Sequence, residues 1–212
     1  MRLIKPYAEI CKDFDGEEML KKIERVARTC YKSEGKIKDG SARKMVAGLI
    51  KSGHDAMLEH ASVTVKFVVD RGISHELVRH RMASFAQEST RYCNYIKDDF
   101  GSEITFIIPK YLDGESAAYD AWKSVMEYCE DAYFYLLNIG FMPQEARAVL
   151  PNSTKTEVVM TANLREWRHF FKLRALGTTG KPHPQMLEVT IPLLEDFKRT
   201  IPVVFDDLIV NR

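Results

Sequence analysis

Three arginines, a histidine and several short polar side chains lie close together in one stretch of the chain. Arg79, His80 and Arg81 are consecutive, and Ser89 and Arg91 follow after a short interval. Guanidinium groups bind phosphate oxygens bidentately and can stack on aromatic rings. Serine and glutamine side chains can donate to and accept from the edge of a base or another planar ring. The stretch therefore indicates a site for a planar, anionic ligand.

A simpler interpretation of the same stretch is a basic helix end followed by a polar loop, since helix C-termini favour cations. Ser74 could act as the N-cap of a helix that runs to about Arg81. Glu76, Arg79 and His80 would then share one helix face, at i, i+3 and i+4. Composition alone favours this simpler interpretation, whereas the order of the residues favours a binding site.

That order resembles the signature of the flavin-dependent thymidylate synthases (the ThyX family), in which Arg-His-Arg is followed by seven residues and then by serine. The stretch from Arg79 to Ser89 fits this signature at every position, and Arg91-Tyr92 matches its usual continuation. The resemblance covers nearly the whole chain. Its other segments, which occur in the family's order, are His54 to His60, Arg147 to Pro151, Asn163-Leu164-Arg165 and Leu173-Arg174.

The resemblance implies an enzyme that makes dTMP from dUMP without an attacking cysteine. FAD, once reduced by NADPH, would mediate transfer of a methylene group from methylenetetrahydrofolate to C5 of dUMP and then supply hydride. The cofactor would carry this chemistry, and the protein would supply placement and electrostatics. The resemblance also implies a homotetramer whose active sites are shared between chains.

The resemblance also assigns residues to dUMP. Arg91 and Arg147 are expected at the phosphate, and Arg79 is expected between dUMP and the flavin. Arg174 is the expected catalytic residue, because a cation beside N3 and O2 of uracil favours an enolate-like ring and a more nucleophilic C5. The complete set expected at dUMP is Glu76, Leu77, Val78, Arg79, Gln87, Glu88, Ser89, Thr90, Arg91, Arg147 and Arg174.

A second set of residues is expected at FAD. Three of its positions depart from a common form of the family pattern. Gln87 stands where many family members have Glu and brings no charge. Ala56 lacks the hydroxyl that others carry, and His169 stands where some have Asn. The folate site is poorly marked, with His54 and Tyr92 as candidates. The complete set expected at FAD is His54, Ala56, Glu59, Arg79, His80, Arg81, Gln87, Asn163, Leu164, Arg165 and His169.

Two other kinds of chemistry were weighed against this assignment. His54, Glu59 and His60 could suggest a zinc site, but an inverted zinc motif needs H-x-x-E-H on a helix. On a helix, at about 100° per residue, His54 and Glu59 would lie on divergent faces. The segment also follows a glycine and precedes a strand, so we expect it to be non-helical. We therefore expect it to bind no metal. The sequence supplies no base for Ser89, so we expect it to hydrogen bond, and Cys93 to be a bystander thiol.

The composition excludes several classes of protein. The chain has 212 residues, with 31 Lys plus Arg against 30 Asp plus Glu. Proteins that bind nucleic acid through phosphate contacts are usually more basic, so this balance disfavours an RNA-binding module, the main alternative to an enzyme. The chain shows no CxxC pair, signal peptide or apolar run of membrane-spanning length. We therefore expect a cytoplasmic protein with no nucleic-acid or membrane partner.

The elements that must position these residues follow from hydrophobic periodicity and from turn residues. They predict an α+β fold with a mixed or antiparallel sheet, in a single domain over residues 1–212. A GxGxxG turn is absent, so a dinucleotide-binding βαβ unit is not expected. The expected strands are 2–9, 61–69, 104–108 and 155–162, with a long loop over 84–100 and helices over 16–31, 41–52, 74–81, 116–139, 143–150, 164–173 and 187–199.

Overall fold

The computed structural model describes residues 1–210 except 12, 94, 96–102, 113 and 115. Helices and strands are combined in an α+β fold, as predicted. The chain forms two compact units that interleave in sequence. Unit 1 comprises Met1–Tyr7, Phe67–Arg79 and Ala86–Val159, and unit 2 comprises Ala8–Lys66, His80–Phe85 and Met160–Arg212. The prediction of a single domain over 1–212 stays a prediction.

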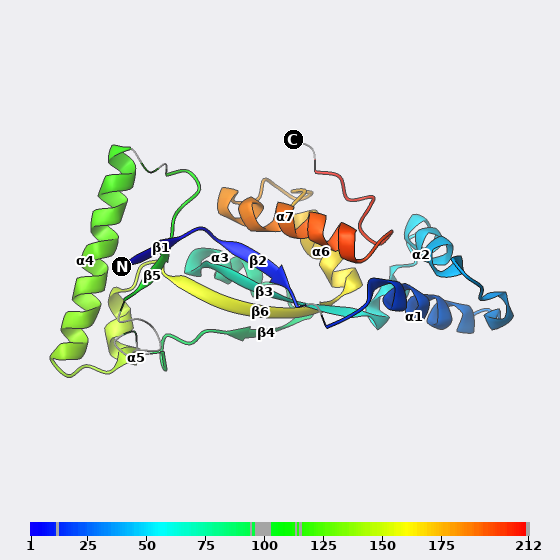
Figure 1. The fold of residues 1–212 in the computed structure, drawn as a ribbon, viewed down its shortest axis with the longest axis horizontal. Coiled ribbons are helices and arrows are strands. Elements are labelled where there is room, and N and C mark those ends of the chain that lie inside the picture. Colours follow the sequence, from blue (N-terminus) through cyan, green and yellow to red (C-terminus); the bar gives the residue numbers. More distant parts are fainter. Residues whose placement is uncertain (12, 94, 96–102, 113, 115, 211–212) are drawn as a thin grey trace. The chain divides into compact units, whose positions relative to one another are not determined.

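The strands form two sheets (Figure 1). In the first sheet, Leu164 donates its backbone N–H to the Ala61 carbonyl, and the hydroxyls of Thr64 and Thr161 lie 2.9 Å apart. β3 and β6 are therefore antiparallel. The four-stranded sheet has the order β2 (Tyr7–Ile10), β3 (Ser62–Asp70), β6 (Lys155–Asn163) and β4 (Ala83–Gln87), and the two-stranded parallel sheet pairs β1 (Arg2–Ile4) with β5 (Thr105–Ile107).

The helices lie close to the ranges that periodicity predicts. Their first turns follow ordinary capping rules, as where Ser116 accepts from the backbone N–H of Tyr119 at the start of α4. The α-helices are α1 (Gly16–Thr29), α2 (Ser41–Lys51), α3 (Arg71–Leu77), α4 (Ala117–Asn138), α5 (Pro143–Ala146), α6 (Leu164–Arg174) and α7 (Pro184–Thr200), and the 3-10 helices are η1 (Glu34–Lys36), η2 (Asp55–His60) and η4 (Arg147–Val149).

Each unit has its own hydrophobic core. In unit 2, α6 and α7 pack through aromatic rings whose centroids lie 5.0–6.0 Å apart, and these rings are fully buried. Burying such rings supplies much of a core's free energy. The residues are Trp167, Phe170, Phe171, Phe197 and Phe205. In unit 1 the corresponding cluster is Tyr95, Ile104, Phe106, Met126, Tyr133 and Ala146.

The predicted helix near the arginine-rich stretch was misplaced. α3 begins at Arg71 because the Asp70 side chain caps it, accepting from the backbone N–H of Ile73 at 2.8 Å. Ser74 is not the N-cap; it is buried inside the helix. α3 ends at Leu77, so Arg79 and His80 lie beyond the helix and do not share a helix face with Glu76.

Three other local predictions were wrong. The loop expected over 84–100 begins with strand β4, which pairs with β6. The segment Asp55–His60, expected to be non-helical, forms a 3-10 helix. The strand expected over 2–9 is divided into β1 and β2 around Pro6, which has no backbone N–H to donate. Within the described residues, no helix combines the length and apolarity needed to cross a membrane.

Candidate active site

Unit 2 holds a polar hollow of about 400 Å³ beside the first turns of α6. Four of the residues expected at FAD line it: Glu59, Asn163, Arg165 and His169. Lys172 and Arg168 add further positive charge, while Asp55 and Glu166 add carboxylates. The hollow therefore combines a group of cations with acceptors and donors, which suits a ligand that is both anionic and rich in polar edges.

The junction of β6 and α6 positions these side chains. Asn163 ends the strand and caps the helix, and its side-chain oxygen accepts from the backbone N–H of Glu166 at 2.8 Å. Trp167 and Phe170 bury one face of α6 in the core. Arg165 is consequently left on the exposed side, where its Nη1 donates to Glu59 of η2 at 2.5 Å.

His54 and Ala56 line a neighbouring, more apolar hollow of about 320 Å³. Tyr31, Cys30 and several aliphatic side chains form the rest of its wall. Asp55 and Arg165 line both hollows, so six of the residues expected at FAD line two hollows that share a wall, and Arg79, His80, Arg81, Gln87 and Leu164 line neither.

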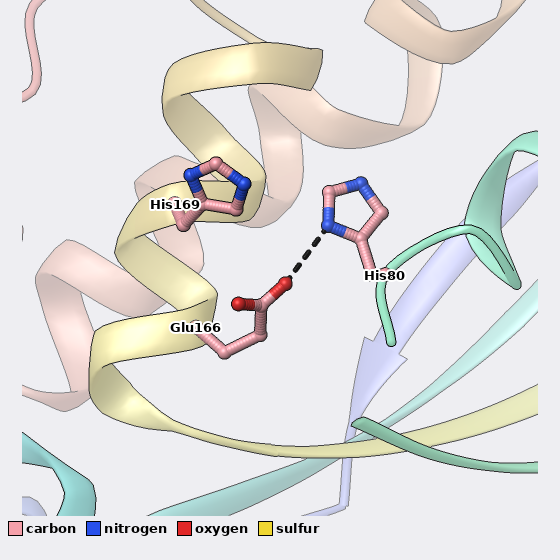
Figure 2. A group of neighbouring side chains, drawn as sticks. All are labelled: His80, Glu166 and His169. Carbon is pink, nitrogen blue, oxygen red and sulfur yellow. Dashed lines mark hydrogen bonds and ion pairs between the residues drawn. The ribbon is translucent and has the colours of Figure 1, made fainter. Parts of the chain in front are cut away.

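His80 lies at the centre of a hydrogen-bonded chain in unit 2. Its ring is buried, with 4% of its surface exposed. Nδ1 lies 3.0 Å from a Glu166 carboxylate oxygen, and Nε2 accepts from the Nε–H of Arg174 at 3.2 Å. Figure 2 shows the imidazole and the carboxylate facing one another, with the ring of His169 beside them. Burial lowers the pKa of His80 below its usual range; the hydrogen bond to Glu166 opposes this shift, while the charge of Arg174 adds to it.

The tautomer of His80 follows from these contacts. The guanidinium of Arg174 can only donate, so Nε2 of His80 must be the unprotonated nitrogen. The ring proton therefore sits on Nδ1 and is donated to Glu166. Ligand atoms of His80, Glu166 and His169 lie within 4.8 Å of one another, a spacing that a metal ion could use. However, both ring nitrogens of His80 are engaged, one of them with a permanent cation, so this geometry is that of a hydrogen-bonded chain.

Arg79 and Arg81, on either side of His80, are both exposed. The boundary between the two units falls between Arg79 and His80. Leu77 and Leu164, expected at dUMP and at FAD respectively, are completely buried in the core. Their side chains therefore pack against protein, and only their backbone groups could meet a ligand.

In unit 1, Arg91 and Arg147 are expected at the dUMP phosphate, and each donates a hydrogen bond to the segment that carries the other. The Nε–H of Arg91 donates to the side-chain oxygen of Gln144 at 3.1 Å, and Nη1 of Arg147 donates to the Thr90 hydroxyl at 3.3 Å. Arg91 also lies over the Tyr92 ring, 5.2 Å from its centroid. Both arginines are exposed and both of these hydrogen-bond partners are neutral. The contacts thus restrain two guanidinium groups without neutralising them.

Other residues expected at dUMP make hydrogen bonds and an ion pair within unit 1. Gln87 donates from Nε2 to the hydroxyls of Ser74 at 3.0 Å and Thr156 at 3.2 Å, so its amide orientation is set by two neighbours. Glu88 forms an ion pair with Lys155 at 2.9 Å, and both side chains are largely buried. Ser89 accepts from the backbone N–H of Arg91 at 3.3 Å, in a hydrogen-bonding role. The half-buried Glu76 and the exposed Val78 complete this set.

The sequence interpretation missed the role of Glu166. Three residues after Asn163, it matches the N3 glutamate of a helix capping box, an explanation that conceals any other role. Its carboxylate instead reaches His80, 86 residues earlier in the chain. The one signal in the sequence is the apolar residues near Glu166 on the helix, which predict that this charged side chain is buried.

The fold and the sequence of this chain resemble those of known proteins. The fold is similar to that of the UMP/dUMP methylase PolB from Streptomyces cacaoi, solved with 5-Br dUMP, which superposes with a TM-score of 0.78, at 23% identity over 97% of this chain and 96% of that one. The family model described as "Thymidylate synthase complementing protein" matches residues 15–203.

Named relatives agree with the family model. A flavin-dependent thymidylate synthase from Geobacter sulfurreducens is 32% identical over 188 residues, which span 85% of this chain and 78% of that protein. One from Pyrococcus furiosus is 37% identical over 140 residues, spanning 66% of this chain and 57% of that protein. The chain belongs to the family of flavin-dependent thymidylate synthases, as its sequence signature predicts.

Proposed function

We propose that this protein converts dUMP to dTMP, with FAD as the bound cofactor, methylenetetrahydrofolate as the carbon donor and NADPH as the reductant. The observation that carries the proposal is the family match over residues 15–203, which includes every residue assigned to either ligand. The name shared by the relatives supports a flavin cofactor in general. The more specific choices of FAD, NADPH and folate belong to the proposal.

The residues of unit 2 suit FAD, whose two phosphates carry negative charge. Arg165, Arg168 and Lys172 line the same hollow; the guanidinium of Arg168 is paired with Asp207, but its buried Nε has no hydrogen-bond partner among the described residues. Asn163 and His169 supply neutral polar groups at the same wall. When bound, the flavin would accept hydride from NADPH and pass reducing equivalents to the forming methyl group. The protein's part is to bind and orient it.

For dUMP, we assign the phosphate to Arg91 and Arg147. A phosphate monoester offers several acceptor oxygens, and guanidinium groups bind them bidentately. The neutral partners Gln144 and Thr90 support this assignment, because they restrain each arginine and leave its charge intact. Arg28, by contrast, is already engaged in an ion pair with Glu24.

We assign the activation of uracil to Arg174. A cation beside N3 and O2 would stabilise negative charge on the ring and raise the electron density at C5, the carbon that must form the new bond. No enzyme nucleophile is needed in this scheme. Burial raises the pKa of the Cys93 thiol, so the thiol stays protonated at neutral pH, as suits a bystander.

The assembly is also part of the proposal. We expect a homotetramer in which each active site receives residues from more than one chain. In such an assembly the arginines of unit 1 and the flavin-binding residues of unit 2 need not come from the same chain to act on one substrate. Size measurement by light scattering, with and without dUMP, tests this arrangement.

The experiment for the function is direct. Purified protein, reloaded with FAD, is incubated with dUMP, methylenetetrahydrofolate and NADPH, and dTMP is measured by chromatography. We expect dTMP in the complete mixture, and none when dUMP or the folate is omitted. A chain that binds oligonucleotides in a salt-sensitive way but takes up no flavin would instead be a nucleic-acid-binding module.

A further inference from the structure

Glu166 is a buried carboxylate that the proposed function leaves without a role. It lies on the first turn of α6 with 8% of its surface exposed. A charge in such a position is costly unless it is hydrogen bonded. Its carboxylate lies 3.0 Å from Nδ1 of His80, whose opposite ring nitrogen accepts from Arg174 at 3.2 Å. The three side chains thus form a continuous chain of contacts that ends at the residue assigned to uracil.

The hydrogen bonds that join Arg174, His80 and Glu166 can run in only one direction. Arg174 can only donate and a carboxylate can only accept, so the imidazole between them must accept at Nε2 and donate at Nδ1. The alternative neutral tautomer would place an N–H against the N–H of Arg174 and a lone pair against the carboxylate. Glu166 therefore selects the tautomer that can hold Arg174, as the aspartate of a hydrolase triad orients its histidine.

The main chain of Arg174 is restrained as well. Its carbonyl oxygen accepts from the hydroxyl of Thr190 on α7 at 2.8 Å, and Thr190 is completely buried. Phe170 packs against the His80 ring, with centroids 4.9 Å apart, which limits movement of the imidazole. With its backbone fixed at one end and its Nε fixed at the other, the guanidinium plane of Arg174 has a defined orientation.

We infer that Glu166, acting through His80, is a positioning residue that orients the guanidinium of Arg174 for its substrate. The inference rests on the proposed function only in naming uracil as that substrate. Misplacement of a reacting group by about 1 Å can lower turnover on the order of 100-fold. Glu166 need not touch either ligand to have such an effect.

The inference also predicts how pH acts on the site. The charged and titratable groups facing His80 are Glu166, His169 and Arg174, all on α6. Protonating His80 would put an N–H on Nε2 and break the contact with Arg174. Turnover should therefore be retained while His80 is neutral, and lost as pH falls through its pKa. Without the Glu166 carboxylate, protonated His80 loses a partner and its pKa falls. The acidic limb of the curve of turnover against pH should therefore move to lower pH.

The test compares Glu166→Ala and Glu166→Gln with Glu24→Gln as the control. Glu24 is also a buried, ion-paired carboxylate of unit 2, but its partners are Arg28 and Ser41. Each variant is loaded with FAD, and kcat and the KM for dUMP are measured across pH. We expect Glu166→Ala to lower kcat roughly 10- to 100-fold, with flavin content and KM little changed. Glu166→Gln, which keeps an acceptor, should lose less and shift the acidic limb downward, and Glu24→Gln should match the parent enzyme.

Two results would overturn the positioning role. One is normal turnover in Glu166→Ala. The other is a loss that matches a fall in flavin content, or that Glu24→Gln reproduces, because either would show a merely structural effect. An acidic limb that stays in place in Glu166→Gln would refute the contribution through His80.

A measurement without turnover separates this inference from the proposed function. Nitrogen NMR of ¹⁵N-histidine-labelled protein, with the His80 signal assigned from a His80→Gln sample, reports which ring nitrogen carries the proton. We expect the Nδ1–H tautomer in the parent protein and a mixture of the two neutral tautomers in Glu166→Ala, where only the Arg174 contact still favours Nδ1–H. If the parent makes no dTMP but shows this change, the proposed function fails and the Glu166–His80 relationship stands. An Nε2–H tautomer in the parent protein would overturn the inference itself.

Discussion

Arg147 donates a hydrogen bond to the hydroxyl of Thr90, 3.3 Å away, and Thr90 precedes Arg91 in the chain. Arg91 in turn donates to Gln144, three residues before Arg147. Each arginine is thereby held by the segment that carries the other. Two separate parts of the sequence, Ser89–Arg91 and Pro143–Val149, are joined into one cationic feature of unit 1.

Replacing Arg91 with alanine should mainly weaken the binding of dUMP. A phosphate contact acts equally in the ground and transition states, so KM should rise while kcat stays nearly constant. Loss of one charge-assisted contact is worth about 1.5–3 kcal/mol, or roughly a 10- to 100-fold rise in KM. Steady-state kinetics with varied dUMP measure this. Lys123→Ala, which removes an exposed cation from α4, is the control; unchanged dUMP affinity in Arg91→Ala would refute the phosphate assignment.

Replacing Arg174 with alanine should lower dTMP formation far more than flavin content. The missing cation stabilises charge that develops during the reaction, and removing one such group typically costs on the order of 100-fold in kcat. Arg174→Lys should recover only part of the activity, because lysine lacks the Nε–H that meets His80. Near-normal turnover in the alanine variant, with flavin bound, would rule out the activation role.

Replacing Arg165 with alanine should weaken flavin retention and leave thermal stability unchanged. Its ion pair with Glu59 is exposed at both ends, with 55% and 43% of the side-chain surfaces accessible, and such pairs contribute little to stability. Flavin absorbance after gel filtration and a thermal melt of the flavin-free protein measure the two effects separately. A lower melting temperature with full flavin retention would assign Arg165 to the fold instead of the cofactor.

Asp207 should stabilise the fold in a pH-dependent manner. Both oxygens of its carboxylate accept from the buried Arg168, each at 2.6 Å, and this hydrogen bonding lowers the pKa of Asp207 below its usual range. A lowered pKa means that the stabilisation is present above the unfolded-state value, about 3.9, and is lost as pH falls through the folded-state value.

Asp207→Asn should therefore lower the free energy of unfolding at pH 7, by about 1 kcal/mol because the carboxylate is half exposed. The difference from the parent should vanish in strong acid. Urea unfolding at several pH values measures it, and a difference that does not shrink as pH falls below the unfolded-state pKa of about 3.9 would contradict the assigned cause.

Much of the fold follows from local sequence patterns. The stripe that predicts the helix over 164–173 becomes the buried face of α6, and alternating β-branched residues predict β3. β4 was missed because Ala83–Gln87 has small and polar residues, with only Phe85 of clear strand preference. Pairing with β6 makes it a strand, and such tertiary context outweighs intrinsic preference.

The candidate site was predicted unevenly for a similar reason. The family resemblance assigns His80 to FAD and Arg174 to dUMP from two different segments, and it does not predict their mutual contact, which joins positions 94 residues apart. Glu166 carries no signature because helix capping alone accounts for a glutamate at that position. Only the folded chain, which brings α6 against His80, shows that these side chains are in contact.

The central claim is that this chain makes dTMP with a bound flavin, and one assay tests it most directly. FAD-loaded protein is supplied with dUMP, ¹⁴C-labelled methylenetetrahydrofolate and NADPH, and the label in the nucleotide is measured. We predict labelled dTMP that depends on dUMP, flavin and reductant together. If dUMP acquires no label with all of these present and FAD bound, the proposed function is wrong.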